Sequence, residues 1–207
     1  PQVSVRVTEQ NPEGATFGFG VVFSNEALTF LKSEDPEIHQ MIIPFMEKWE
    51  NMTLNLPAGQ VTLDGVGFTA ISRHRLIEVL RKRATALGIP VRFETELKSL
   101  DELKADIIIG ADGLHSLVRR TYAKTFKPQL EYFKNHFAWF GASIPFDTLT
   151  QTFIETSNGP LNAHHYRFSP DRSTFIIECE NETFKSFGFS KMDEIAVSYT
   201  HLRAHET

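Results

Sequence analysis

Runs of apolar residues with a period of two, or without interruption, mark several predicted strands. Residues 3–8 alternate apolar with polar side chains and are followed by Glu9, which predicts a half-buried strand. Residues 106–109 read Asp-Ile-Ile-Ile, and three consecutive β-branched residues predict a strand that is buried on both faces of a parallel sheet. We expect this strand to end at Gly110 and a short helix to begin at Ser116.

Three longer helices are predicted from capping residues and breakers. Ser24 can cap a helix over residues 25–32, and Asp35-Pro36 should begin a second helix that runs to about residue 50. Pro44 lies inside that second segment and could kink it. A third helix should begin at residues 72–73 and stop at Gly88. Residues 54–63 predict a hairpin around Pro-Ala-Gly.

The pattern changes after Tyr132. Four strand-like runs follow, separated by Pro, Asp, Ser and Gly: residues 137–142, 151–155, 162–168 and 173–179. The sequence therefore predicts an α/β (α+β) fold, in which an incomplete Rossmann-like parallel sheet with helices precedes a mostly antiparallel β lobe. We place the domains at residues 1–130 and 131–195.

Composition narrows the class of protein. The chain has 207 residues, of which 41% are hydrophobic and 23% charged, as in ordinary globular proteins. Its net charge of -5 and the lack of a basic stripe argue against a nucleic-acid partner. Cys179 is the single cysteine, so no internal disulfide can form. With no signal-peptide pattern and no stretch long enough to cross a bilayer, we expect a cytoplasmic protein without membrane contact.

Asp112 is the main candidate for ligand binding. It lies between Gly110 and Gly113, directly after the predicted strand at residues 106–109. Ligands of open α/β sheets bind beyond the carboxyl ends of the strands. A carboxylate at this edge can accept hydrogen bonds from the hydroxyls of a ribose or a polyol.

The segment GADGLHSLVRR, residues 110–120, resembles the Asp-Gly motif G-A-D-G-x-x-S-x-V-R of flavin-dependent aromatic hydroxylases of the p-hydroxybenzoate hydroxylase type. The alternative is an ordinary strand, turn and helix of another α/β protein. The resemblance implies an FAD-binding domain with a β-sheet lobe over the flavin, and hydroxylation of an aromatic substrate with FAD, NAD(P)H and O2. Because this chemistry belongs to the flavin, we expect no catalytic nucleophile among the side chains.

The resemblance assigns cofactor contacts to several positions. Glu9 would end the second strand of a dinucleotide-binding unit and hold the adenosine ribose. Gly20 and Val21, in the run FGFGVVFS, would lie beside the isoalloxazine ring, although alternating glycine and aromatic residues can also mark a twisted strand entry. Arg73 would contact the ribityl-phosphate arm, and Asp112 with Gly113 the ribityl or pyrophosphate side.

Two segments suggest the substrate. The run FGFGVVFS, and residues 163–169 with 173–179, are similar to hydroxylases of salicylyl-CoA and anthraniloyl-CoA and to the tryptophan-derivative hydroxylase of violacein biosynthesis. This resemblance implies an aromatic substrate such as an aryl-CoA thioester. On a strand, His164 and Tyr166 share one face and are the candidate substrate-binding residues, whereas His165 and Arg167 share the other. Since the adjacent histidines point apart, we expect no metal site.

The chain is expected to be a fragment. The first strand with its G-x-G-x-x-G turn and a later Gly-Asp motif of the family are absent, so the chain alone should neither hold FAD tightly nor be active. Residues 196–207 resemble a non-native tail of translated adapter sequence. Oligomeric state is left open.

Other functions compete with hydroxylation. A halogenase, a reductase or an indole-type hydroxylase could share the FAD fold, and Glu9 taken alone also suits a nicotinamide dehydrogenase. The chain could also be a truncated product without function.

Overall fold

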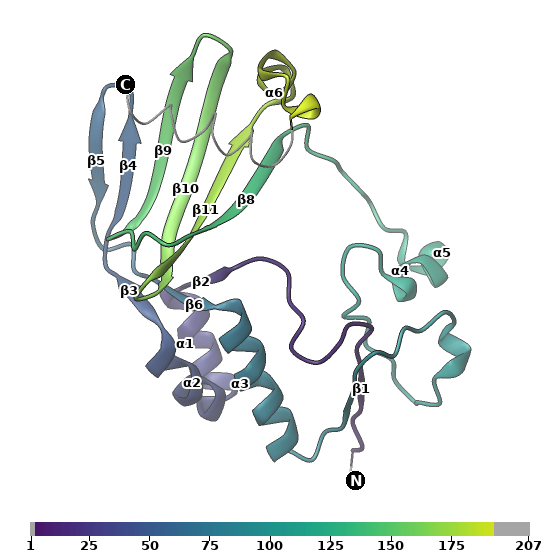
Figure 1. Ribbon diagram of the computed structural model, residues 1–207. Helices are drawn as coiled ribbons and strands as arrows, with labels where there is room; N and C mark the ends of the chain where they lie inside the picture. The colour runs from purple at the N-terminus through teal and green to yellow at the C-terminus, as the bar shows by residue number, and fades with distance from the viewer. Residues whose placement is uncertain (1–2, 193–207) are drawn as a thin grey trace. The chain divides into compact units, whose positions relative to one another are not determined.

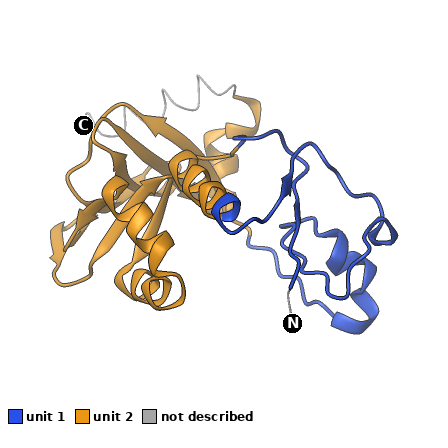
Figure 2. Cartoon of the chain, turned by 90° about the horizontal axis from the view of Figure 1, so that it is seen from below, with its two compact units in different colours: residues 1–15, 84–133 blue, residues 16–83, 134–207 orange. Residues whose placement is uncertain are grey.

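The computed structural model describes residues 3–192 (Figure 1). The chain forms two compact units, each made of two segments (Figure 2). Unit 1 comprises Pro1–Ala15 and Ala84–Phe133, and unit 2 comprises Thr16–Arg83 and Lys134–Thr207. This division differs from a boundary near residue 130, because residues 16–83 pack with residues that follow it. The assignment of cofactor and substrate roles to residues 1–130 and 131–195 stays a prediction, and the tail at 196–207 lies outside the described residues.

The larger sheet of unit 2 has the strand order β5-β4-β9-β10-β11-β8. Its strands are β4 (Met52–Leu56), β5 (Gly59–Leu63), β8 (His136–Ala142), β9 (Leu149–Thr156), β10 (Gly159–Ser169) and β11 (Arg172–Cys179). All neighbours are antiparallel except β4 and β9, which run parallel. The mostly antiparallel lobe is therefore confirmed, and the predicted hairpin at residues 54–63 supplies the edge strand β5 and its neighbour β4.

A smaller sheet, β2-β6-β3, lies between the larger sheet and a layer of helices. Its strands are β2 (Gly20–Ser24), β3 (Glu47–Trp49) and β6 (Phe68–Ser72), and the helices are α1 (Asn25–Glu34), α2 (Pro36–Ile42) and α3 (Arg73–Ala86). Successive side chains of β6 point to opposite faces of the smaller sheet and pack into two different hydrophobic cores. Ala70 packs with Trp49 and Tyr166 on the side of the larger sheet, whereas Ile71 packs with Leu28 and Val79 under the helices.

The helix predictions were correct for α1 and α3 and too long for α2. Ser24 caps α1 by accepting a hydrogen bond from the backbone N–H of Ala27. Helix α2 ends at Ile42, and the turn η1 (Ile43–Phe45) contains Pro44. The chain then pairs with β6 as β3, so hydrogen bonding to a sheet replaces the predicted final turns of the helix.

A third core lies at the end of the larger sheet. Helix α6 (Asn181–Phe187) and the turn η3 (Phe189–Lys191) bring Phe184 and Phe189 against Leu161 and Cys179. None of the described helices combines the length and apolar character that a membrane crossing needs.

Unit 1 contains little regular structure in its described part. Strand β1 (Val7–Thr8) pairs in parallel with β7 (Val91–Arg92), and the remaining elements are η2 (Leu100–Glu102), α4 (Leu117–Thr121) and α5 (Ala123–Phe126). The ladder of β1 is much shorter than the predicted strand over residues 3–8.

The predicted strand at residues 106–109 was wrong. The segment is irregular, and the side chains of Ile107 and Ile109 are 80% and 86% exposed. A buried parallel strand requires hydrogen-bonded neighbours and helices over its faces. Among the described residues of unit 1, the only ladder is the two-residue pairing of β1 and β7, which leaves this apolar segment without a paired strand.

We expect Ile71→Ala to destabilise unit 2 by about 2–5 kcal/mol, since Ile71 is fully buried between β6 and the helices and its truncation leaves a cavity. Leu80→Ala is the matched control, because Leu80 on α3 is 43% exposed and should cost about 1 kcal/mol or less. Urea unfolding followed by tryptophan fluorescence measures both. Equal losses would contradict this assignment of the core.

Candidate functional site

Gly20 joins the two sheets of unit 2. Its backbone N–H donates to Thr174 Oγ1 (3.0 Å), and its carbonyl accepts a hydrogen bond from the Tyr166 hydroxyl (3.1 Å). A Cβ on Gly20 would lie 2.8 Å from Cβ of Phe168 and 2.9 Å from the Tyr166 ring. The glycine is therefore required by packing within the protein, whatever its relation to a ligand. Burial raises the pKa of Tyr166 above its ordinary value of 10.0, so its hydroxyl stays a hydrogen-bond donor.

Gly18 and Phe19, which precede Gly20, also pack closely against a side chain of the larger sheet. Gly18 has a φ of +86°, and a Cβ there would come within 2.4 Å of the Trp139 ring. Phe19 packs edge-on against the same ring, with 6.2 Å between ring centroids. The glycine–aromatic run therefore lies against side chains of the larger sheet.

Arg73 lies next to the contact between Gly20 and the larger sheet. Ser72 pairs with Gly20 across β6 and β2, and the backbone N–H of Arg73 donates to the carbonyl of Phe19 (2.8 Å). The side chain of Arg73 is half-buried at the start of α3 and forms no ion pair with a carboxylate among residues 3–192. Val21 pairs with Ile71, and its side chain packs under the helices. Gly20, Val21 and Arg73 thus lie close together.

One face of the larger sheet carries both predicted substrate-binding residues. His164 is opposite Ile176 and Tyr166 is opposite Thr174, whereas His165 is opposite Phe175 on the other face. The pairing of His164 with Ile176 and of Ile176 with Trp139 continues this surface across the sheet. We call it the His164 face and define it by six residues. They are Trp139, Gln151, Phe153, Asn162, His164 and Ile176.

The His164 face contains polar atoms that lack a partner. Asn162 Oδ1 and Trp139 Nε1 are buried and have no hydrogen-bond partner among the described residues. An unsatisfied buried polar atom costs about 1–3 kcal/mol, so each is a candidate contact for a polar group of a ligand. Burial lowers the pKa of His164 below its ordinary value of 6.5, and the nearby Glu178 carboxylate opposes this shift. A neutral imidazole can both donate and accept hydrogen bonds.

His165 has a different environment from His164. Its ring packs against Phe146 (3.9 Å between centroids) and Phe175 (5.3 Å), as expected for a core histidine. Within the part of the chain that the structure describes, no group of three or more potential metal ligands converges.

The carboxylate of Glu9, in unit 1, accepts hydrogen bonds from a residue two positions further along the chain. It follows β1, and its Oε1 atom accepts hydrogen bonds from the backbone N–H (2.7 Å) and the side-chain amide (2.8 Å) of Asn11. The contacts orient the carboxylate, which retains further acceptor sites.

Asp112 accepts hydrogen bonds at the start of helix α4, whose N-cap residue is Ser116. Its Oδ1 accepts from the Ser116 hydroxyl (2.6 Å), and its Oδ2 accepts from the backbone N–H groups of Leu117 and Val118. These hydrogen bonds, that of Ser116 first, lower the pKa of Asp112 below its ordinary value of 3.8. Gly110 is packed against this helix, because a Cβ there would lie 2.8 Å from Val118 Cβ.

Gly113 has a φ of +70°, a conformation that favours glycine, and no atom lies within 4 Å of a Cβ built there. The Asp-Gly motif is thus a helix start with open space at its second glycine.

FAD fits part of this arrangement. Arg73 offers a guanidinium without an ion-pair partner among residues 3–192, at the start of a 14-residue helix beside Gly20, which suits a phosphate or a ribityl oxygen. The carboxylates of Glu9 and Asp112 are held in place by local donors and could accept from hydroxyl groups. The fit concerns each unit by itself.

The fold is that of FAD-dependent monooxygenases. The 2-methyl-3-hydroxypyridine-5-carboxylic acid oxygenase superposes with a TM-score of 0.68 and 17% identity, over 86% of this chain and 52% of that one. PqsL of Pseudomonas aeruginosa in complex with 2-aminobenzoylacetate gives a TM-score of 0.67 and 12% identity, over 87% of this chain and 55% of that one. The predicted fold class is therefore confirmed. No protein-family model matches the chain.

Sequence relatives are aromatic monooxygenases. Salicyloyl-CoA 5-hydroxylase of a Streptomyces species is 32% identical over 194 residues, which are 93% of this chain and 38% of that protein. Protodeoxyviolaceinate monooxygenase of Chromobacterium violaceum is 29% identical over 95% of this chain and 53% of its own length. The 3-hydroxy-4-methyl-anthranilyl-[aryl-carrier protein] 5-monooxygenase of Streptosporangium sibiricum is 28% identical over 85% of this chain and 50% of its own. These findings confirm the resemblance, and the chain spans about half or less of each relative.

The two residues of the His164 face with unpartnered buried polar atoms, Asn162 and Trp139, were not recognised in the sequence. Asn162 has the same strand parity as His164, so the period of two along residues 162–168 could have identified it. For Trp139, the sequence indicates only a tryptophan within a predicted strand. Its neighbours on the sheet depend on pairing between distant segments, so the sequence alone could not identify them.

We expect Asp112→Asn to reduce hydrogen-exchange protection of the Leu117 and Val118 amides, because a weaker acceptor then faces these first-turn N–H groups of α4. Since the pKa of Asp112 is lowered on folding, the wild-type interaction is fully present above pH 3.8 and is lost as the pH falls further. Hydrogen exchange or amide NMR across this range measures the effect. Asp106→Asn, on the same segment, is the control. Unchanged protection in Asp112→Asn would refute this role of Asp112.

Proposed function

We propose that the chain is part of an FAD-dependent monooxygenase that hydroxylates an aromatic substrate with NAD(P)H and O2. The observation that carries the proposal is similarity along 93% of the chain to a salicyloyl-CoA 5-hydroxylase. When bound, FAD would supply the redox chemistry with oxygen. The residues of this chain would bind and orient the cofactor and the substrate.

Each unit by itself contains residues that would contact the cofactor. Arg73 would hold an anionic or hydroxyl oxygen of the flavin chain beside Gly20 and Val21, since its guanidinium has no carboxylate partner among the described residues. In unit 1, the carboxylates of Glu9 and Asp112 would accept hydrogen bonds from ribose or ribityl hydroxyls, and Gly113 leaves room for close approach.

The aromatic substrate would bind on the His164 face. Trp139, Phe153 and Ile176 provide apolar surface for a ring, and His164 and Asn162 provide hydrogen bonds to its polar substituents. Tyr166, the other predicted substrate contact, would act by shaping this surface, because its hydroxyl is bonded to Gly20.

An aromatic acyl thioester is the favoured substrate class. Two relatives are named for an aromatic acyl group on a carrier, salicyloyl-CoA in one and an anthranilyl group on an aryl-carrier protein in the other. The violacein-pathway relative supports a tryptophan-derived substrate as the second candidate. Titration with both classes of compound separates them.

We expect the purified chain to bind salicyloyl-CoA with a change in Trp139 fluorescence that CoA alone and salicylate alone reproduce only weakly. His164→Leu should weaken this binding about tenfold through the loss of a hydrogen bond in a partly buried site. Trp139→Phe identifies the source of the signal, and His74→Gln on the exposed surface of α3 is the control. Equal affinity of His164→Leu and wild type would place the substrate elsewhere.

We expect Arg73→Ala to lower the affinity for FAD about tenfold, because a charge-assisted hydrogen bond is lost. Arg75→Ala is the matched control, since Arg75 is two residues further along α3 and is paired with Glu78 (2.5 Å). Titration followed by flavin fluorescence measures both variants. If Arg75→Ala weakened binding as much as Arg73→Ala, the assignment of Arg73 would be wrong.

A further inference from the structure

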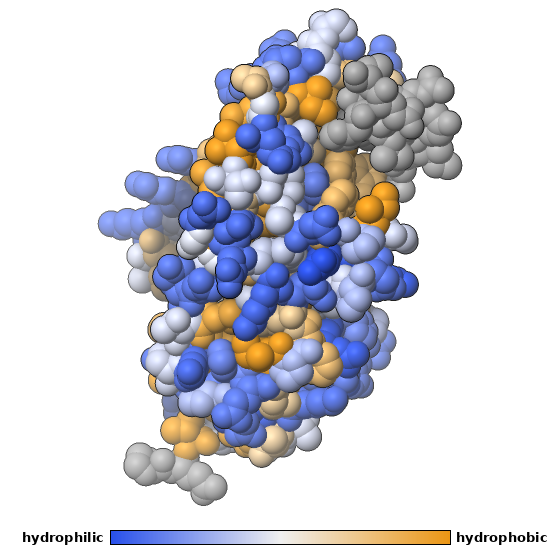
Figure 3. Space-filling model, turned by 90° about the vertical axis from the view of Figure 1, so that its left-hand side faces the viewer, coloured by the Kyte–Doolittle hydropathy of each residue, from blue (hydrophilic) through white to orange (hydrophobic). Residues whose placement is uncertain are grey.

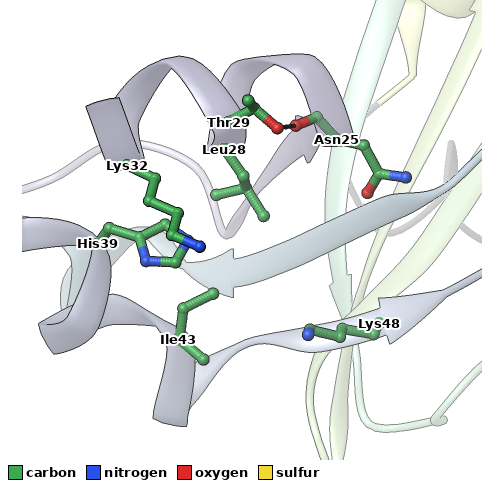
Figure 4. Close-up of a pocket in the computed structure, with 7 residues that line it drawn as sticks. All are labelled: Asn25, Leu28, Thr29, Lys32, His39, Ile43 and Lys48. Carbon is green, nitrogen blue, oxygen red and sulfur yellow. Dashed lines mark hydrogen bonds between the residues drawn. The ribbon is translucent and has the colours of Figure 1, made fainter. Parts of the chain in front are cut away.

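Unit 2 has a hollow of about 360 Å³ that is separate from the residues assigned above. It lies where α1, α2 with η1, and β3 meet (Figure 4). Its lining residues are Asn25, Leu28, Thr29, Lys32, His39, Ile43 and Lys48. Figure 3 shows this side of the molecule, where apolar surface at the level of α1 and α2 is surrounded by hydrophilic side chains.

The lining of the hollow combines basic and apolar groups. Lys32 comes from α1, His39 from α2 and Lys48 from β3, and all three line the hollow (Figure 4). Leu28 and Ile43 provide apolar surface between them. None of the seven lining residues is acidic. Two ammonium groups and an imidazole therefore face a space that holds no negative side chain.

Three carboxylates on the neighbouring elements form ion pairs elsewhere. Asp35 and Glu37 on the α2 side both pair with Arg83 of α3, and Glu47, next to Lys48 on β3, pairs with Arg167 (2.7 Å). Lys32 and Lys48 form no ion pair within residues 3–192.

Two other lysines of unit 2, in contrast, form ion pairs with a carboxylate. Lys82 pairs with Glu78 (2.9 Å) and Lys185 with Glu182 (3.1 Å). Among the described residues, therefore, no carboxylate balances the charges of Lys32 and Lys48 at ion-pair distance. An anion between the two lysines would supply that balance.

We propose that this hollow binds a phosphate group of a small ligand. Lysine ammonium groups are compact charges with three donors each, a common means of holding phosphate oxygens. His39 also lines the hollow, and its ring can donate an N–H. The volume exceeds that of one phosphate, and Leu28 and Ile43 could contact an apolar part such as a nucleotide base. The proposal does not depend on the hydroxylase function.

The test uses ¹⁵N-labelled full-length chain titrated with sodium pyrophosphate and, separately, with ADP at constant ionic strength. We expect saturable shifts in the amides of residues 25–32, 39–43 and 48. The double variant Lys32→Gln/Lys48→Gln should weaken binding of both compounds at least tenfold, whereas Lys32→Arg/Lys48→Arg should retain it. Lys82→Gln/Lys185→Gln is the control with the same change in net charge and should bind as wild type.

Each outcome decides the proposal. Equal affinities for pyrophosphate and ADP would assign the hollow to phosphate groups alone, and tighter binding of ADP would assign it to a nucleotide. No saturable shift at these residues, or equal weakening by Lys82→Gln/Lys185→Gln, would overturn the site. The thermal unfolding midpoint of each variant shows that the folded state is being compared, and all four lysines are exposed to solvent.

Discussion

The hydrogen bonds at Gly20 are the interaction on which the arrangement of unit 2 depends. Thr174 and Tyr166, on adjacent strands of the larger sheet, bind the N–H and the carbonyl of one glycine in the smaller sheet. A side chain at this position would push the sheets apart, because Phe168 and Tyr166 already fill the space. The contact thereby fixes where β2 crosses the larger sheet, and with it the start of α3 at Arg73 and one end of the His164 face.

Local signals were sufficient for much of the fold. Ser24 as a cap, Pro57-Ala58 as a two-residue connection and the alternation along β10 each act over a few residues, and each element formed as expected. Predictions failed where an element depends on distant partners. Residues 106–109 have the composition of a buried strand but no paired strand among the described residues, and the end of the predicted helix at residue 50 pairs with β6 instead.

The candidate site could be predicted in part for the same reason. The Asp-Gly motif singled out Asp112, and the structure adds that its carboxylate holds the first turn of α4. A period of two placed His164 and Tyr166 on one face, yet it could not indicate that the Tyr166 hydroxyl binds Gly20, 146 residues away. Asn162 shares that period of two, whereas Trp139 emerged only once pairing between strands placed the buried polar atoms of both residues on the same surface.

The parallel pairing of β4 with β9 gives unit 2 an unusual chain path. Thr53 and Asn55 pair with Thr150 and Thr152, so segments separated by nearly a hundred positions form adjacent strands of one sheet. Closing so long a loop is entropically costly and slows the assembly of such a sheet. Residues 84–133 belong to unit 1 and connect the two segments of unit 2. A backbone cut within them would leave β4 and β5 on one polypeptide and β8 to β11 on the other, without interrupting any strand of the sheet. Unit 2 is in this respect a natural candidate for reassembly from two separately expressed halves.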